Sequence, residues 1–432
     1  MLLFISDLHF VDETAGKHNV PAMTFKRMLK DLKRYGGKPS EIKIVFLGDI
    51  FDLNRSTYWL ELDESERPWG DLENKKKKIE QHVNHILDSI LAKNQSTFNL
   101  LQGSLKKQFG FPVEPERVYI PGNHDRLCNL FPSLRKKVRE NLGMEGGAEP
   151  FPHVYDDADY DNQYAVWARH GHEYDIWNYE GSDGLSEADY AQIPIGDLIT
   201  TEIAARLPYT LVQSLQNTLS PQPLCHLRRH LEEVENVRPP TAIFDWLFFQ
   251  AKAHPEIKDK MGEALKGIVE NFNNLPYLQR WYKRHDQWNL FTFDEADRLQ
   301  TGLRMFKFLD LESVEGLLRL YTKIFGTPDA MPTENADQAL MDKAKEFLTH
   351  QSDYRYCILG HTHNPMQVPI RITSKGIEQM YLNTGTWRAK HTKGLSGGFI
   401  TLKNLTYTIV YSKKENPHQE LETWTGSLKE IL

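Results

Sequence analysis

Short apolar runs recur along the chain, and each one ends in a polar cluster. Short continuous apolar runs are typical of buried strands. These runs begin at Leu2, Ile42, Val118, Ala165 and Tyr356. Because the strands of one sheet place their carboxyl ends along one edge, we expect the five polar clusters to converge there.

The polar clusters combine carboxylate, imidazole and amide side chains, and glycine lies beside nearly all of them. They are Asp7-Leu8-His9, Gly48-Asp49-Ile50-Phe51-Asp52, Gly122-Asn123-His124-Asp125, His170-Gly171-His172 and Gly360-His361-Thr362-His363. Side chains of these types, brought together, form sites for one or two divalent cations. Glycine lets the backbone turn sharply and approach a ligand closely, which ordinary polar loops at strand ends do not require.

The rest of the pattern divides the chain into two kinds of segment. Met23–Arg34 and Leu72–Ala92 have the spacing of helices, so the first part alternates strands with helices. Between about 181 and 350 the strand signals disappear and apolar residues recur at helical spacing. One helix face is predicted for Leu198, Ile199, Ile203 and Leu207, and similar stripes run through Leu211–Val234, Ile243–Ala253, Met261–Phe272, Phe306–Ile324 and Ala336–Leu348. The strands predicted beyond them are Gln367–Ile372, Glu378–Leu382, Gly398–Leu402 and Leu405–Tyr411.

We therefore predict one discontinuous domain, formed by 1–180 and 351–432, with 181–350 as a mostly helical insertion. The insertion leaves the domain after His170-Gly171-His172 and returns before Gly360-His361-Thr362-His363. A segment tethered at both ends beside the clusters is expected to overhang them as a cap and to influence which substrates enter.

Composition narrows the class of protein. The 432 residues are 40% hydrophobic and 26% charged, which is typical of a soluble globular chain of two or three domains. A formal net charge of −7 argues against a protein dominated by nucleic-acid binding. Three widely separated cysteines predict neither a disulfide framework nor a zinc knuckle. With no apolar run long enough for a membrane span and no room for a signal peptide before Leu2, we expect a cytoplasmic location.

The five clusters, in this order, resemble the motifs of the calcineurin-like metallophosphoesterase superfamily, over roughly 1–180 and 351–432. The resemblance implies an α/β fold, a four-layer αββα sandwich of two mixed sheets. It implies two divalent cations and makes this chain a metal-dependent phosphoesterase. Asp49 is the candidate bridging ligand, because a carboxylate offers two oxygens. The resemblance adds Asp7, His9 and His363 as ligands of the first cation, and Asn123, His170 and His361 as ligands of the second.

The expected chemistry follows from this ligand set. Two cations about 3.5–4 Å apart neutralise a phosphate ester and turn a bound water into hydroxide, the expected bridging nucleophile. Oxygen and imidazole donors suit Mn²⁺, Fe or Zn²⁺ better than Ca²⁺. Because no cysteine is among the ligands, we favour Mn²⁺.

Other motif residues are expected to act on the substrate. The resemblance makes His124 a general acid that protonates the leaving oxygen, held by a neighbouring carboxylate. Asp52 and Asp125 are both candidates for that carboxylate, and the GD-x-x-D pattern favours Asp52. His172 is expected either to support the site or to contact the phosphate. Arg388 either forms a turn at a strand end or binds the phosphate with its planar fork of donors.

Departures from the motifs of two branches of the superfamily argue against both branches. Protein Ser/Thr phosphatases have Arg-Gly after the second Asp of GD-x-x-D, whereas Leu53 follows Asp52 here. Purple acid phosphatases need a tyrosine ligand at a position where this chain has Asp52. The remaining branches include small bacterial phosphodiesterases, UDP-diacylglucosamine hydrolases and SbcD-type nucleases.

Several alternatives remain open. An SbcD-type DNA nuclease would need a basic groove, and Lys75-Lys76-Lys77-Lys78 is either part of one or a solvated helix face. A catalytically inactive phosphoesterase-fold scaffold is the rival from another class. Aromatic and basic residues in Tyr277–His285 suit a helix core, base stacking or a lid over a lipid chain. The substrate (nucleotide, lipid precursor or nucleic acid), the preference for monoesters or diesters, and the oligomeric state are left undecided.

Overall fold

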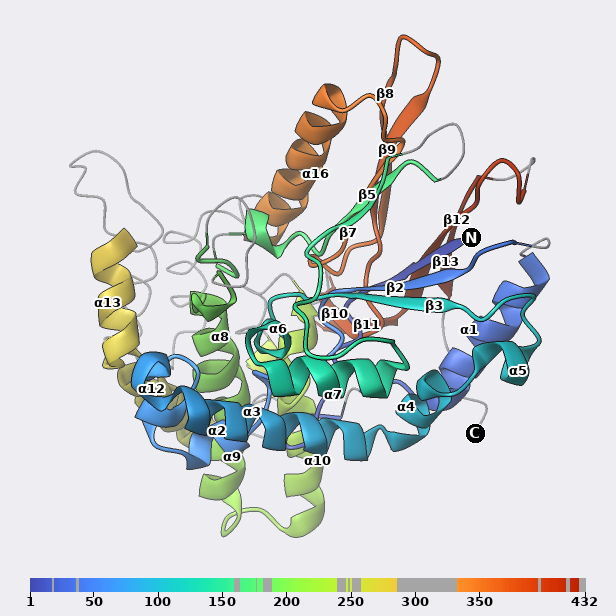
Figure 1. The fold of residues 1–432 in the computed structure, drawn as a ribbon. Helices are drawn as coiled ribbons and strands as arrows, with labels where there is room; N and C mark the ends of the chain where they lie inside the picture. Colours follow the sequence, from blue (N-terminus) through green and yellow to red (C-terminus); the bar gives the residue numbers. More distant parts are fainter. Residues whose placement is uncertain are drawn as a thin grey trace.

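The structure is a computed structural model. It describes residues 1–17, 19–35, 39–158, 164–175, 177–181, 189–238, 246–247, 249–250, 258–285, 332–394, 398–416 and 420–426. The helix predicted at Phe306–Ile324 lies outside the described residues, and so does most of Ile243–Ala253. Two sheets lie at the centre of Figure 1, between α16 (Pro332–His350) and a set of helices that includes α1 (Ala22–Tyr35), α3 (Leu72–Lys93) and α7 (Pro132–Leu142).

The first sheet is mixed and contains the strands of the first three motifs. Its spatial order is β13 (Leu421–Gly426), β12 (Leu405–Val410), β1 (Leu2–Ile5), β2 (Lys43–Leu47) and β3 (Glu116–Ile120). β1, β2 and β3 run parallel, and β12 pairs antiparallel with β1. All four residues of β1 are buried, as expected for a central strand with a continuous apolar sequence.

The second sheet is also mixed and contains the strands of the last two motifs. Its spatial order is β4 (Tyr155–Asp157), β5 (Val166–Ala168), β7 (Tyr356–Leu359), β9 (Glu378–Asn383) and β8 (Met366–Ile372). β5, β7 and β9 run parallel, and the two edge strands are antiparallel. The expectation that all five motif strands share one sheet is therefore wrong. The clusters converge because two sets of parallel strands bring their carboxyl ends to the same place.

The two sheets pack face to face, and helices cover their outer faces. Phe4 of the first sheet and Ile358 of the second belong to one apolar cluster between the sheets. Ile5, one position on, faces the opposite way and packs among residues of α1, α3, α4 (Gln95–Gln102) and α7. On the far side, Leu340 of α16 packs on Cys357 of β7. The predicted α/β class with two mixed sheets is confirmed.

The helices of the first part match the sequence closely. α1 and α3 confirm the helices predicted at Met23–Arg34 and Leu72–Ala92. The side chain of Asp71 caps α3 by accepting a hydrogen bond from the Asn74 backbone. The shorter helices and turns are α2 (Tyr58–Glu61), α5 (Leu105–Phe109), α6 (Leu127–Leu130), Glu64–Glu66, His172–Tyr174 and Asp189–Ala191. In the described part of the chain, no helix combines the length and apolar character that a membrane span requires.

The described part of the insertion is helical apart from one short strand. Its helical elements are α8 (Ile195–Leu198), a π-helical stretch (Ile199–Ala205), α9 (Arg206–Leu215), α10 (Pro221–Leu231), the turn Val234–Asn236, α12 (Lys258–Asn273) and α13 (Pro276–His285). The strand β6 (Val237–Arg238) pairs with β10 (Ala389–Lys393), which pairs with β11 (Phe399–Lys403). α16, which the sequence placed in the insertion, forms the outer layer of the second sheet instead.

A buried ion pair joins the insertion to the loop after the third motif. Arg126 donates from Nε and Nη2 to Asp197 Oδ2 at 2.9 and 2.7 Å, and Asn54 donates to Asp197 Oδ1 at 2.9 Å. Both members of the ion pair are almost completely buried. Burial raises the pKa of Asp197, although the Arg126 guanidinium opposes the rise. The pair therefore adds little net stability, but the loss of one member leaves a buried charge without its partner.

We expect Asp197→Ala to lower the free energy of unfolding by about 3–5 kcal/mol, because Arg126 then stays buried without its carboxylate. Urea unfolding followed by circular dichroism measures the change. Glu140→Ala is the matched control, because it breaks an exposed pair with Lys136 whose loss should have little effect. Equal losses in the two variants would contradict the importance of the buried contact.

Candidate metal centre

The loops that follow β1 and β2 run side by side and bring the first two motifs together. The backbone N–H of Asp7 donates to Gly48 O at 3.1 Å, and that of His9 donates to Asp49 O at 2.9 Å. The two loops then form an isolated parallel bridge between Phe10 and Phe51. The carboxylates of the two motifs are thus held by backbone pairing that continues the sheet beyond its regular strands.

Backbone strain is concentrated at the candidate ligands. Seven non-glycine residues among those described have positive φ, and five of them are candidate ligands. The φ values are 52° at Asp7, 47° at His9, 53° at Asp49, 71° at His361 and 61° at His363. Such conformations cost of order 1–3 kcal/mol each and persist only where the surrounding structure imposes them, typically at active sites and ligand clamps.

Two glycines are required by close packing around Asp49 and His170. Gly48 has a φ of +82°, and a Cβ there would overlap the His170 ring. A Cβ on Gly122 would overlap the carboxylate of Asp49. These positions exclude a side chain because the backbone itself approaches the ligand groups.

Asp7, His9 and His363 form the first ligand group. His363 Nε2 lies 3.2 Å from Asp7 Oδ1 and 3.0 Å from His9 Nε2. His9 Nε2 lies 3.8 Å from Asp7 Oδ1. One carboxylate oxygen and two imidazole nitrogens therefore face one another at a spacing that suits a shared divalent cation.

Asp49, His170 and His361 form the second ligand group, with Asn123 beside it. His170 Nε2 lies 3.3 Å from Asp49 Oδ2 and 3.3 Å from Asn123 Oδ1. The ligand atoms of Asp49, His170 and His361 all lie within 4.8 Å of one another. The structure thus brings together the residues that the sequence assigned to a second cation.

Asp49 lies between the two groups. The same oxygen, Oδ2, is 3.8 Å from His9 Nε2 and 3.3 Å from His170 Nε2. The other oxygen, Oδ1, accepts a hydrogen bond from the His124 backbone at 2.9 Å. This position is the one required of a ligand shared by two cations.

Hydrogen bonds fix which nitrogen of each imidazole faces the site. His170 Nδ1 lies 2.9 Å from Leu47 O, so its Nε2 is left to face Asp49. His361 Nε2 lies 2.9 Å from Asp175 Oδ2, while its Nδ1 is buried without a hydrogen-bond partner among the described residues. Metal-binding histidines usually have one nitrogen held in this way, by a carbonyl or a carboxylate. The donor set and its support therefore fit divalent cations.

The charges of the site favour cations as well. Burial alone would raise the pKa of Asp49, but the His170 and His124 imidazoles outweigh it and hold that pKa well below its ordinary value. Burial opposes charge on His170, yet Asp49 raises the pKa of His170 to about 10. Burial keeps the pKa of His9 below its ordinary value. Without a metal, buried carboxylates thus hold a proton on a neighbouring imidazole, and a cation would take the place of that charge.

His124 and Asp52 form a pair beside the first group. His124 Nδ1 lies 2.9 Å from Asp52 Oδ1, and the rings of His124 and His9 are 4.7 Å apart. Burial lowers the pKa of His124, but Asp52 and Asp49 outweigh it and raise that pKa well above its ordinary value. The His124 side chain is 18% exposed, whereas Asp52 is fully buried. The ring is therefore charged, oriented and accessible. His9, Asp49 and His124 also meet the spacing of a ligand group, so geometry alone does not separate acid from ligand.

Asp125, the other carboxylate considered as the partner of His124, accepts hydrogen bonds from backbone amides instead. Its Oδ2 accepts from the Ile50 backbone at 2.8 Å, and its Oδ1 accepts from the Gly122 backbone at 2.6 Å. Burial, together with the charge of Asp49, raises the pKa of Asp125 to about 6. Of the two carboxylates considered as partners of His124, the structure therefore selects Asp52. Asp125 joins the loops of the second and third motifs.

Arg388 contacts Asp52 of the His124–Asp52 pair. Its Nη1 is 3.7 Å from Asp52 Oδ2, and its Nη2 is 3.6 Å from Glu235 Oε2. Glu235 also pairs with Arg55 at 2.9 Å. Among the described residues, Arg388 Nε has no hydrogen-bond partner. Arg388 thus contacts the carboxylate that holds His124, and a residue of the insertion contacts Arg388 in turn.

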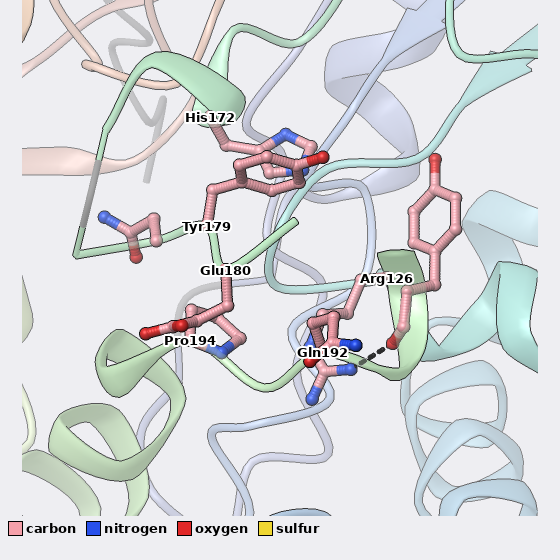
Figure 2. Close-up of a pocket in the computed structure, with 8 residues that line it drawn as sticks. Arg126, His172, Tyr179, Glu180, Gln192 and Pro194 are labelled. Atoms are coloured by element: carbon pink, nitrogen blue, oxygen red, sulfur yellow. Dashed lines mark hydrogen bonds between the residues drawn. The ribbon is translucent and has the colours of Figure 1, made fainter. Parts of the chain in front are cut away.

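His172 lies beside the second group and lines a neighbouring pocket. Its ring centroid is 5.3 Å from that of His170 and 5.8 Å from that of Tyr179. Burial, together with the charge of His170, holds the pKa of His172 well below its ordinary value, so the ring is neutral. The residues that line this pocket include His172, Arg126 and Glu180, as Figure 2 shows.

Sequence reasoning missed three residues that support the site. Asp175 and Asn178 contact the candidate ligands His361 and Asn123 at 2.9 and 3.1 Å. Glu235 contacts Arg388 from the insertion. The only sequence signal for Asp175 and Asn178 is their position just after His170-Gly171-His172, and Glu235 has no signal of its own.

Comparison with known proteins adds no identification. No protein-family model matches the chain, and a search of curated proteins finds no match.

Proposed function

We propose that this protein is a metal-dependent phosphoesterase of the calcineurin-like type, which hydrolyses a phosphomonoester or phosphodiester. One observation carries the proposal. Two groups of ligand side chains meet at the strand ends of two sheets, with Asp49 Oδ2 near His9 of one and His170 of the other, and five candidate ligands have strained backbone. The order of the five motifs and the α/β sandwich of mixed sheets support the same assignment.

The ligand set assigns two cations. Asp7, His9 and His363 would hold the first, Asn123, His170 and His361 would hold the second, and Asp49 would be shared. When bound, the cations neutralise the phosphate ester and lower the pKa of a water molecule. Imidazole and oxygen donors suit Mn²⁺, Zn²⁺ or Fe, and we favour Mn²⁺.

His124 supplies the proton in this proposal. Hydrolysis forms a bond from a water oxygen to phosphorus and breaks the bond to the leaving oxygen, which must then take a proton. The charged ring of His124 can give that proton because Asp52 holds Nδ1, which leaves Nε2 for the leaving oxygen. Burial alone would raise the pKa of Asp52, but the charge of His124 outweighs burial and holds that pKa far below its ordinary value. Asp52 therefore stays ionised and keeps the His124 ring oriented.

The contacts of the lysine run support its assignment as a solvated helix face. Lys78 and Lys75 both pair with Glu66, the latter at 3.9 Å. Part of the run's charge is therefore already matched on the surface of α3. The scaffold alternative predicts a loss of ligands, whereas candidate ligands from all five motifs are grouped here.

Metal removal and refilling test the proposal. The purified protein, treated with a chelator, should lose turnover of aryl phosphomonoesters and phosphodiesters, and Mn²⁺ should restore it. Elemental analysis should find about two cations per chain. If calorimetry detects no binding of Mn²⁺ to the folded chain, the proposed metal centre is contradicted. Cation binding without turnover of phosphoesters or of DNA would favour the scaffold.

A further inference from the structure

Asp175 and residues 177–180, called the linking turn below, lie between the second ligand group and the insertion. Asp175 and Asn178 are tied to each other within it. Asn178 Nδ2 donates to Asp175 Oδ2 at 2.8 Å, and the Asn178 backbone N–H donates to Asp175 O at 2.9 Å. Only 14% of the Asp175 side chain is exposed. Burial would raise its pKa, but the contacts with His361 and Asn178 outweigh burial and lower it. The turn therefore carries a fixed carboxylate and a fixed amide at one end.

These two side chains determine which atoms of the ligands face Asp49. Asp175 holds His361 Nε2, which leaves Nδ1 as the ring nitrogen free to bind a cation. Asn178 Oδ1 accepts from Asn123 Nδ2 at 3.1 Å, so the amide oxygen of Asn123 is the atom directed at His170. An amide turned the other way would present N–H groups, which cannot bind a cation.

The other end of the turn is packed on α13 of the insertion. The rings of Trp177 and Trp281 stack with centroids 6.2 Å apart and planes at 24°. Glu180 accepts hydrogen bonds from Trp281 Nε1 and from His285 Nε2, the latter at 2.9 Å. Trp281 is 1% exposed, so this contact is a buried part of the insertion. Figure 2 shows Tyr179 next to His172, and Glu180 lines the same pocket.

We propose that the linking turn, formed by Asp175 and residues 177–180, couples the insertion to the second cation site. Asp175 and Asn178 are positioning residues for His361 and Asn123, and the packing of the turn on Trp281 holds them in place. The affinity for the second cation then depends on α13, whereas the first cation, held by Asp7, His9 and His363, is independent of it. This inference rests on the proposed function, since it assumes two cation sites.

The first experiment titrates Mn²⁺ into chelator-treated protein and measures the two affinities by calorimetry. Asp175→Ala should weaken the second site about 10- to 100-fold, the usual effect of removing a group that orients a metal ligand. The first site should keep its affinity. Asp175→Asn retains an oxygen that can accept from His361 Nε2, and should therefore recover part of the loss.

The second experiment tests the remote end of the turn. Trp281→Ala should weaken the second site selectively, and Trp281→Phe, which keeps the ring packing but loses the N–H to Glu180, should weaken it less. Phe347→Ala is the matched control, because Phe347 of α16 stacks on Trp167 of β5 in the second sheet. It should leave both sites unchanged.

The outcomes separate this inference from the proposed function. Wild-type protein that binds no Mn²⁺ would remove the metal centre itself. If the wild-type protein binds two cations, and Asp175→Ala and Trp281→Ala both bind the second cation as tightly as wild type, the coupling is overturned and the metal centre remains. If Trp281→Ala fails to fold, Asp175→Ala and Trp281→Phe still decide the question.

Discussion

Replacement of Asp49 by asparagine should remove both cations and lower phosphoester turnover roughly 10³-fold or more, since bound metal contributes several kcal/mol to stabilising the transition state. The reason is the position of Asp49 Oδ2, between His9 of the first group and His170 of the second. The neutral amide keeps one oxygen but loses the charge that both groups share. Elemental analysis of the purified variant gives the cation content directly.

Asp12→Asn is the control for this variant. Asp12 is also buried and accepts hydrogen bonds from Thr14 and Ser56, but it belongs to none of the ligand groups found among the described residues. It should retain both cations. Asp49→Asn protein that is folded and holds two cations per chain would rule out Asp49 as the shared ligand. Retention of one cation would show that Asp49 serves only one group.

Individual strands and helices could be predicted from their own residues, whereas the two-sheet sandwich was implied only by the family resemblance. β1 is four consecutive buried apolar residues, and α3 has a full apolar stripe with a capping aspartate before it. The sheet to which each strand belongs could not be predicted. An apolar run fixes that a strand is buried, but its neighbours are set by contacts across the whole chain.

The neighbours of the elements in and beside the insertion were even harder to predict from the sequence. β6 has two residues, too few for any period to appear, yet it pairs with β10 from the end of the chain. α16 has a clear apolar stripe, but only the packing of Leu340 on Cys357 shows that it covers the second sheet. A deletion of the insertion designed to test the cap would therefore also remove α16, which covers the second sheet, and Asp197, which pairs with Arg126. Point variants at the contacts test the cap more cleanly.

In the site, the grouping of the candidate ligands could be predicted from the sequence, whereas the residues that support them could not. Asp7, Asp49 and His363 stand in motifs whose residue types already suggest ligands. Asp175 is 186 positions away from His361, the ring it holds, and no local pattern records such a contact. The choice between Asp52 and Asp125 likewise depended on which carboxylate the fold directs at His124 and which it directs at backbone amides.

Replacement of His124 by alanine should retain both cations yet lower the rate roughly 10²–10⁴-fold on esters with poor leaving groups, the usual contribution of a positioned general acid. Activated aryl esters should lose much less, because their leaving oxygen departs without a proton. The wild-type rate should fall at alkaline pH: the folded-state pKa of His124 is raised, so the ring stays protonated through neutral pH and loses its proton only above it. The variant should lack that fall.

The comparison of the two substrate classes decides between acid and ligand, which the spacing of His9, Asp49 and His124 leaves open. A ligand would affect every substrate, since each one depends on the same cations. An acid affects only those substrates whose leaving group needs the proton. Equal losses on both classes, together with a reduced cation content, would therefore assign His124 to the metal, and Asp52 would then be the group that orients a ligand rather than an acid.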